Sequence, residues 1–484
     1  MYCVIPGRRI GAALAIAALL AGCGGGGGGN GGGSVGAAPT PAPTPTPTPT
    51  AVAGCSLRER QDWLAAQMRE WYLFPETLPA TLDPSPYASA DAYLDALTAT
   101  ARGQRRDRYF TYLTSIAEEN AYYNSGATAG FGFRLASSAD RTRIYVSEAF
   151  EGAPALAGGI DRGAEIVAIG TTPATLRTIE QIAREDGGSL TPALGPDTPG
   201  TQRSFRITDA AGTRVVTLAK ADYTLAPVSS RYGAKIITDG GRRVGYVNLR
   251  TFIGTADQAL RDAFAQFRTA GVTDLIVDLR YNGGGLIATA ELMNDLLGRN
   301  RTTGEVQGYT TFRPEKSARN TQRNFTVQPQ SVAPTRIAFI GTGGTASASE
   351  LVINAFVPYY RTNVALIGSN TYGKPVGQIA IDRSACDDRL RVVAFAVQNS
   401  ARSAAYFDGL ATTMEASCQA GDDLTRPLGD PAEASTRAAL DYLAGRPCTK
   451  IGASTAQAQR AIAPREALTP DRPSTAQREV PGLF

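Results

Sequence analysis

The sequence DLRYNGGG occupies residues 278–285 and overlaps the end of an apolar, strand-like stretch, Thr273–Leu279. Glycines in such a turn permit positive φ and let backbone N–H groups approach a ligand closely. Two more polar segments follow strand-like stretches, GGTASASE at residues 343–350 and GSNTYGKP at residues 368–375. The carboxyl ends of parallel strands meet at one edge of an α/β sheet, where sites form. The sequence therefore predicts a site that draws on all three segments.

Strand-like and helical stretches alternate around these segments, which favours an α/β core with some parallel strands. Upstream, the spacing of apolar residues predicts helices, followed by a region of short strands and turns. The predicted organisation is a signal peptide (1–22), a tether (23–54), a helical segment (55–125), a β-rich domain (126–224), the α/β core (225–448) and a mobile tail (449–484).

The first residues predict export and anchoring. Arg8 and Arg9 precede the apolar run Ile10–Leu20, which is too short to span a membrane. The ending LAGC at residues 20–23 resembles the lipobox of bacterial lipoproteins, which implies cleavage before Cys23 and lipidation of its thiol. An ordinary signal peptide is the alternative. Gly24 follows instead of Asp, so we expect an outer-membrane lipoprotein facing the periplasm of a bacterial envelope, with a Gly-rich and Pro-Thr-rich spacer behind it.

Composition excludes several functions. The chain of 484 residues has no histidine, so it has no Ser-His-Asp or Cys-His arrangement and no His-ligated metal site. A net charge of +4 without a long basic run argues against nucleic-acid binding. Only five of the 48 basic residues are lysines, and lysine, unlike arginine, can act as a base when it is desolvated. We expect no metal and no cofactor.

Four cysteines remain after the predicted signal peptide and lipidation site, namely Cys55, Cys386, Cys418 and Cys448. An even number in an oxidising compartment predicts two disulfides, for which three pairings are possible. Cys386–Cys418 would close a local loop and Cys55–Cys448 would join the ends of the folded part. This is the pairing that we expect.

Two of the three segments also match patterns with another function. Residues 368–374 nearly match a phosphate-binding loop, but Pro375 stands where a Ser or Thr would hold magnesium, so we exclude a nucleotide site. Ser347 and Glu350 have the spacing of a capping box at a helix start, which would satisfy free N–H groups without any catalysis.

Together the three segments resemble the carboxy-terminal processing peptidases, or tail-specific proteases, a family of serine–lysine peptidases with a ClpP/crotonase-like α/β core. The resemblance implies that Ser347 is the nucleophile, Lys374 the general base and Gln378 the residue that orients the lysine. It also implies that the N–H groups of Gly284 and Ala348 form the oxyanion hole. Pro375 replaces a glycine of the family pattern, and proline lacks an N–H group and fixes φ.

The resemblance extends upstream, where Phe131, Gly132 and Phe133 look like the carboxylate-binding loop of a PDZ domain and residues 147–170 like the rest of one. We expect a serine endopeptidase that binds protein or peptide substrates with unstructured C-termini. A buried lysine fits this chemistry, because burial lowers an amine pKa from its usual value of about 10.4. The alternative is a PDZ-type peptide-binding lipoprotein that cuts nothing. The sequence does not predict an oligomeric state.

Overall fold

The computed structural model describes residues 53–452 and 465–484. The predicted signal peptide, Cys23 and nearly all of the predicted tether lie outside the described residues, as does the segment 453–464. Within the described ranges, no helix combines the length and apolar character that a membrane crossing requires.

A six-stranded mixed sheet forms the centre of the fold, in the order β10-β11-β12-β15-β16-β19. Its strands are β10 (Lys235–Asp239), β11 (Arg242–Asn248), β12 (Asp274–Asp278), β15 (Arg336–Gly341), β16 (Val364–Gly368) and β19 (Ala416–Gln419). The first pair is antiparallel and the other neighbouring pairs are parallel. The prediction of an α/β core with parallel strands is therefore confirmed.

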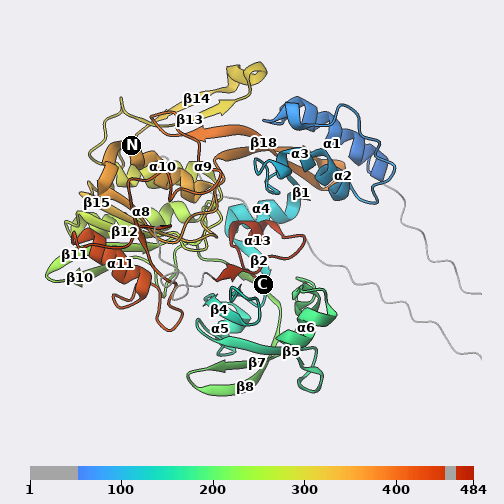
Figure 1. The fold of residues 1–484 in the computed structure, drawn as a ribbon, viewed down its shortest axis with the longest axis horizontal. Helices are drawn as coiled ribbons and strands as arrows, with labels where there is room; N and C mark the ends of the chain where they lie inside the picture. Colours follow the sequence, from blue (N-terminus) through green and yellow to red (C-terminus); the bar gives the residue numbers. More distant parts are fainter. Residues whose placement is uncertain (1–52, 453–464) are drawn as a thin grey trace, which may run out of the picture. The chain divides into compact units, whose positions relative to one another are not determined.

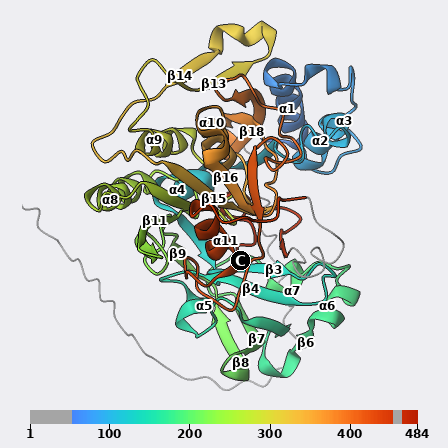
Figure 2. The same ribbon diagram turned by 60° about the vertical axis from the view of Figure 1, so that its left-hand side comes forward.

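Helices cover both faces of this central sheet. Along β12, Leu275 and Val277 join one apolar cluster and Ile276 joins another, because successive side chains of a strand point to opposite faces. The opposite faces are visible in Figure 2, where α10 and α11 lie on different sides of β15 and β16. The covering helices are α8 (Ala256–Thr269), α9 (Ile287–Leu297), α10 (Ala348–Tyr360) and, on the second face, α11 (Ala434–Leu443).

A second sheet has five strands and is antiparallel. One of its strands begins directly after residues 368–375, the segment that contains Lys374. Its strands are β1 (Tyr112–Ser115), β13 (Val306–Phe312), β14 (Thr321–Asn324), β17 (Val376–Arg383) and β18 (Asp388–Gln398). Short 3-10 helices occur at Pro75–Thr77, Pro173–Thr175, Pro314–Arg319, Arg361–Asn363 and Ser384–Cys386.

The N-terminal helices pack on this second sheet (Figure 1). They are α1 (Leu57–Trp71), α2 (Ala90–Leu97), α3 (Ala99–Gly103) and α4 (Ile116–Ser125). Ser56 starts α1 because Glu59 completes a capping box with it. Leu64 and Met68 are fully buried in a cluster that includes Val392 of β18. The segment predicted to be helical is largely so, but it also supplies β1 to the sheet.

Residues 126–224, here called the β-rich region, form a third sheet with its own apolar core. The short pair β2 (Ala127–Gly130) and β9 (Ala221–Thr224) brings its two ends together. The sheet contains β3 (Phe133–Ser137), β4 (Ile144–Ala149), β5 (Glu165–Gly170), β6 (Arg177–Thr178), β7 (Gln202–Asp209) and β8 (Gly212–Ala219). Short helices accompany it, namely α5 (Pro154–Ala157), α6 (Ile179–Glu185) and α7 (Thr191–Leu194).

Residues 465–484 differ from the expectation of a mobile tail. Strand β20 (Glu466–Ala467) pairs with β3, and helix α13 (Thr475–Glu479) contacts α4. Val480, Leu483 and Phe484 are 0%, 2% and 4% exposed. The expectation is wrong for these residues because their apolar side chains enter two buried clusters.

The disulfides are Cys55–Cys386 and Cys418–Cys448, so the expected pairing is wrong. Cys55 precedes α1, which packs on the hairpin of β17 and β18, and Cys386 lies in the turn of that hairpin. Cys418 is on the edge strand β19, where Gln419 N–H donates to the Thr449 carbonyl oxygen at 2.7 Å and so brings Cys448 alongside. Packing of the helix and the edge strand therefore sets the pairing.

We predict that losing the Cys55–Cys386 disulfide destabilises the fold more than losing Cys418–Cys448. The sequence separations are 331 and 30 residues, and a longer closed loop constrains the unfolded chain more. Replacing the first pair by alanine should lower the free energy of unfolding by about 2–4 kcal/mol, measured by urea denaturation against the second pair as control. Peptide mapping that found a Cys386–Cys418 link would contradict this assignment.

Candidate active site

The three polar segments meet at one edge of the central sheet, as predicted. They follow β12, β15 and β16, which are adjacent and parallel. Thr345 joins them, because its hydroxyl donates to the Leu279 carbonyl oxygen at 2.8 Å and its own carbonyl oxygen accepts from Tyr372 N–H at 2.9 Å. The serine, lysine and glycine segments therefore share direct contacts.

Ser347 is the N-cap of α10 and is half-buried. At the start of the helix, the hydroxyl lies near the positive end of the helix dipole, which favours negative charge there. Its backbone has φ 54° and ψ −113°, whereas an ordinary capping serine of this chain, Ser56, is extended at φ −61° and ψ 153°. A positive φ costs energy in a residue with a side chain and occurs often at functional sites. Capping alone does not require it.

Glu350 holds the serine and lysine segments together. Its carboxylate accepts from Ser347 N–H at 3.1 Å, which is the capping-box contact expected from the sequence, and also from the N–H groups of Gly373 and Lys374, each at 2.7 Å. The side chain is fully buried, and burial raises its pKa while these hydrogen bonds oppose the rise. One buried carboxylate thus fixes the backbone on both sides of the site.

Lys374 and Gln378 are brought together, since Lys374 Nζ donates to Gln378 Oε1 at 3.0 Å. Gln378 Nε2 in turn donates to the Phe110 carbonyl oxygen, and Nζ lies 5.3 Å from the centre of the Phe110 ring. Part of the lysine remains accessible, yet desolvation by the surrounding protein lowers the pKa of its ammonium group. The amine is thereby closer to the neutral form that a base needs.

The N-terminal segment contributes residues that the sequence did not identify. Besides Phe110, Arg108 reaches the lysine segment, where its Nη2 donates to the carbonyl oxygens of Tyr372 and Gly373, each at 2.6 Å, and of Phe407 at 3.0 Å. No motif marks Arg108, because its role depends on the packing of a segment more than 260 residues away in the chain.

The predicted oxyanion residues lie beside the serine. A Cβ built on Gly284 would be 2.8 Å from Ser347 Cβ and 3.1 Å from Ala348 N, and the glycine has φ +126°. The structure differs from the expectation in one respect, because Gly284 N–H already donates to Asn282 Oδ1 at 2.9 Å. The neighbouring Gly283 N–H instead donates to the Glu479 carbonyl oxygen at 2.9 Å. A role of Gly284 and Ala348 as oxyanion donors stays a prediction.

The residues predicted to bind a carboxylate form a backbone loop in the β-rich region. Phe131 and Phe133 are fully buried with stacked rings 5.5 Å apart. Gly132 lies between them with φ +77°, and a Cβ there would be 2.0 Å from Ala153 Cβ, so only glycine fits. The N–H groups of Gly132 and Phe133 donate to the Phe484 carbonyl oxygen at 2.9 and 3.4 Å. These N–H groups do bind a carbonyl oxygen.

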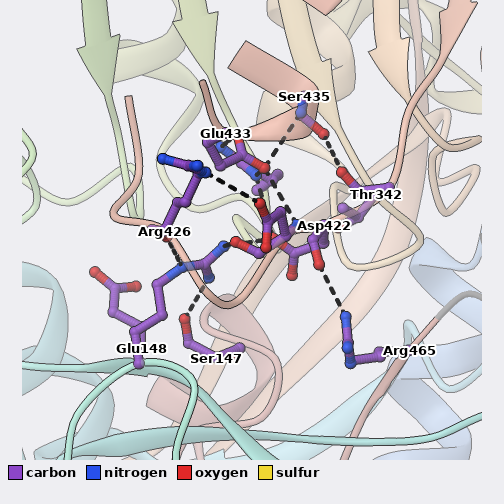
Figure 3. Close-up of polar contacts among 12 residues, drawn as sticks. Ser147, Glu148, Thr342, Asp422, Arg426, Glu433, Ser435 and Arg465 are labelled. Carbon is purple, nitrogen blue, oxygen red and sulfur yellow. Dashed lines mark hydrogen bonds and ion pairs between the residues drawn. The ribbon is translucent and has the colours of Figure 1, made fainter. Parts of the chain in front are cut away.

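A buried polar cluster connects the glycine turn with the β-rich region. Asp422 accepts from Arg280 Nη1 at 3.2 Å and from Arg162 Nη2 at 2.7 Å, and Arg162 Nη1 also donates to the Ser147 carbonyl oxygen at 2.6 Å. Figure 3 shows Asp422 between Glu433 of the core and Ser147 of the β-rich region. Burial opposes ionisation, but the two arginines outweigh it and lower the pKa of Asp422 to about 2.

We predict that Gly284→Ala slows any reaction at Ser347 about 100-fold, since a shift of about 1 Å in a reacting group costs this much. The new methyl group would meet Ser347 Cβ and strain the backbone. The measurement is kcat/KM with a peptide substrate. Gly212→Ala is the matched control, because Gly212 has φ +103° but no atom within 4 Å of a Cβ. Equal rates in the two variants would show that the turn does not adjoin the reacting serine.

Comparisons with known proteins agree with this geometry. The family model "Peptidase family S41" matches residues 243–406, which include Ser347, Lys374 and Gln378, and "Peptidase S41 N-terminal domain" matches residues 59–112, which include Phe110. A solved structure from Bacteroides fragilis, assigned to the S41 proteases, superposes with a TM-score of 0.61 over 79% of this chain and 97% of that chain, at 23% identity. This likeness shows the fold.

Two curated relatives are also similar in sequence. A carboxyl-terminal-processing protease from Synechocystis is 27% identical over 54% of this chain and 56% of the relative. Carboxyl-terminal-processing peptidase 3 of Arabidopsis thaliana is 26% identical over 55% of this chain and 49% of the relative. The chain thus spans about half the length of these relatives. On the family match and the curated relatives, the chain belongs to peptidase family S41, a family of serine-type peptidases.

Proposed function

We propose that this chain is a serine endopeptidase of the carboxy-terminal processing type, with Ser347 as nucleophile and Lys374 as base. The observation that carries the proposal is the contact network of Glu350, which ties a strained serine at a helix start to a desolvated lysine. The chain has no histidine, so a neutral lysine amine is the base that this site offers.

The proposed reaction has two stages. Ser347 Oγ attacks the carbonyl carbon of a peptide bond while Lys374 Nζ takes the hydroxyl proton. N–H groups at the start of α10 and in the glycine turn stabilise the oxyanion. The C–N bond then breaks, and the leaving amine receives the proton from the Lys374 ammonium group. A water molecule hydrolyses the Ser347 ester in the same way, and Lys374 again accepts and returns the proton.

The β-rich region would deliver the substrate as a PDZ-like domain. Its loop at Phe131–Phe133 presents N–H groups that bind a backbone oxygen, and the following strand β3 has an edge to which another chain segment can pair. Addition of a peptide as an extra strand is a common mode of tail recognition. The relatives in Synechocystis and Arabidopsis are named for carboxyl-terminal processing, which supports a flexible protein tail as the substrate.

The test is cleavage of a folded reporter that carries an unstructured C-terminal tail. Ser347→Ala and Lys374→Ala should each abolish the cleavage and leave the far-UV spectrum and melting unchanged. Ser56→Ala, which removes another helix-capping serine, and Lys235→Ala, which removes another lysine whose pKa burial lowers, should cleave as the wild type does. Binding without cleavage in the wild type would favour a peptide-binding protein instead.

We also predict the pH dependence of this cleavage. Because Lys374 must be neutral to act as base, kcat/KM should rise with pH through the pKa of Lys374 and then reach a plateau. Desolvation lowers that pKa, so the midpoint should lie below about 10.4, the value of a free lysine. Lys374→Arg should stay inactive across the range, since a guanidinium group remains charged. A rate that falls as pH rises through this range would exclude a lysine base.

A further inference from the structure

Residues 474–484, here called the strap segment, lie across both functional parts of the molecule. They run from α13, beside α4, to the edge of β3, and Figure 1 shows the C-terminal label at the β-rich region. On the way they contact the glycine turn that adjoins Ser347. The strap segment therefore contacts both the loop at Gly132 and Phe133 and the glycine turn beside Ser347.

At one end, the strap segment pairs with β3 as an added antiparallel strand. Phe484 N–H donates to the Phe133 carbonyl oxygen at 3.0 Å, and the Phe484 carbonyl oxygen accepts from Gly132 N–H at 2.9 Å. Leu135 N–H donates to the Gly482 carbonyl oxygen at 2.7 Å, and Leu483 forms an antiparallel bridge with Arg134. The N–H donors of the predicted tail-binding loop are thus engaged by this chain itself.

Side chains reinforce this backbone pairing. Phe484 is 4% exposed and joins the apolar core of the β-rich region, in the cluster that contains Phe131, Phe133 and Ile182. Leu483 packs in a separate cluster at the junction with α4. The tail-binding groove, which here means the edge of β3 together with this apolar cluster, therefore accepts a large apolar residue beside Phe131 and Phe133. Burial of such a residue stabilises the bound state of a peptide by about 1.5–3 kcal/mol.

At the other end, the strap segment contacts the active-site turn. Gly283 N–H donates to the Glu479 carbonyl oxygen at 2.9 Å, and Tyr123 donates its hydroxyl proton to Glu479 Oε1 at 2.9 Å. Arg478 lies over the Tyr112 ring at 3.8 Å. This end of the strap segment is helical: Val480 N–H donates to the Ala476 carbonyl oxygen at 2.8 Å. A helical turn does not present an extended peptide bond for attack.

We propose that the strap segment is an internal ligand of the tail-binding groove and that an external tail must displace it. This rests on the proposed function for what the groove does in catalysis. Tails that compete with it place large apolar residues at the positions that Leu483 and Phe484 hold here. Only those molecules whose strap segment has left β3 can bind an external peptide, so the apparent affinity is reduced in proportion to their fraction. Loss of the strap contacts raises this fraction and therefore increases the affinity.

The binding experiment uses the full chain with Ser347→Ala, so that no cleavage interferes. The probe is a fluorescent peptide of the sequence Gln477–Phe484 with a free carboxyl group, followed by anisotropy. Adding Leu483→Asp and Phe484→Asp to the protein should tighten probe binding at least about tenfold. Asp471→Ala, an exposed residue ahead of the strap segment, is the control and should change nothing. A probe whose last two residues are Asp should bind weakly to every variant.

Hydrogen exchange gives a second measurement that needs no change in the strap segment. In the Ser347→Ala chain, saturating unlabelled peptide should speed exchange of the amides of residues 476–484, because these leave their partners on displacement. Asp471→Ala should respond in the same way. Unchanged exchange at saturation, or equal probe affinity with and without the strap substitutions, would overturn the proposal.

The two proposals fail in different ways. If the strap variant binds the probe more tightly but no form cleaves a tailed reporter in a Ser347-dependent way, the internal ligand stands and the peptidase function falls. If wild type and strap variant, both with Ser347 intact, cleave a reporter ending in Leu-Phe equally at subsaturating concentration, the internal ligand falls and the peptidase stands. We expect the strap variant to cleave several-fold faster.

Discussion

The site depends on the Glu350 carboxylate, which accepts hydrogen bonds from three backbone N–H groups. One belongs to Ser347 at the start of α10, and the other two belong to Gly373 and Lys374 in the loop after β16. A fully buried carboxylate is costly unless its oxygens are hydrogen-bonded. The three N–H groups meet this requirement, and they can do so only if the start of α10 and the loop after β16 are held in one relative position. The same contacts that make the buried charge tolerable therefore also set the strained backbone of Ser347 and the direction of Lys374.

The environment of the lysine explains why the N-terminal helices belong to this fold. Desolvation of an ammonium group needs surrounding protein, and the N-terminal segment supplies part of it. Phe110 provides a ring beside Nζ and a carbonyl oxygen for Gln378, and Arg108 holds the carbonyl groups next to Lys374. These residues reach the site because α1 and α2 pack their apolar faces on β17 and β18, the hairpin that begins just after Lys374. Stability of the N-terminal segment and basicity of the lysine are thus coupled.

The sequence was sufficient to predict what local rules determine. Strand ends followed by Gly-rich or Ser-rich turns indicated that Ser347, Lys374 and the glycine turn would meet, because parallel strands share an edge. The disulfide partners could not be obtained in this way, since Cys55 and Cys386 are brought together by helix-on-sheet packing that no spacing encodes. The pairing of Asp422 with Arg162 was missed for the same reason, because residues 260 positions apart in the chain come together only in the fold. The last residues looked mobile because the tail is rich in Ala, Gln, Arg and Pro, whereas the apolar side chains of residues 480–484 are buried by partners far away in the chain.

Recognition by backbone N–H groups explains why the chain can occupy its own groove. The loop at Gly132 offers donors that any extended segment can use, so main-chain pairing alone does not distinguish a substrate from a neighbouring part of the same chain. A tethered segment also has a high effective concentration at the groove, so even a weak internal ligand competes well. Gly482 permits the required approach, because its φ is +90° and a Cβ there would be 2.6 Å from the Leu135 carbonyl oxygen. In the proposed mechanism, selection among external tails then comes from the apolar cluster that holds Phe484. The side chain at the end of a tail, more than its backbone, would decide whether the tail can replace the strap segment.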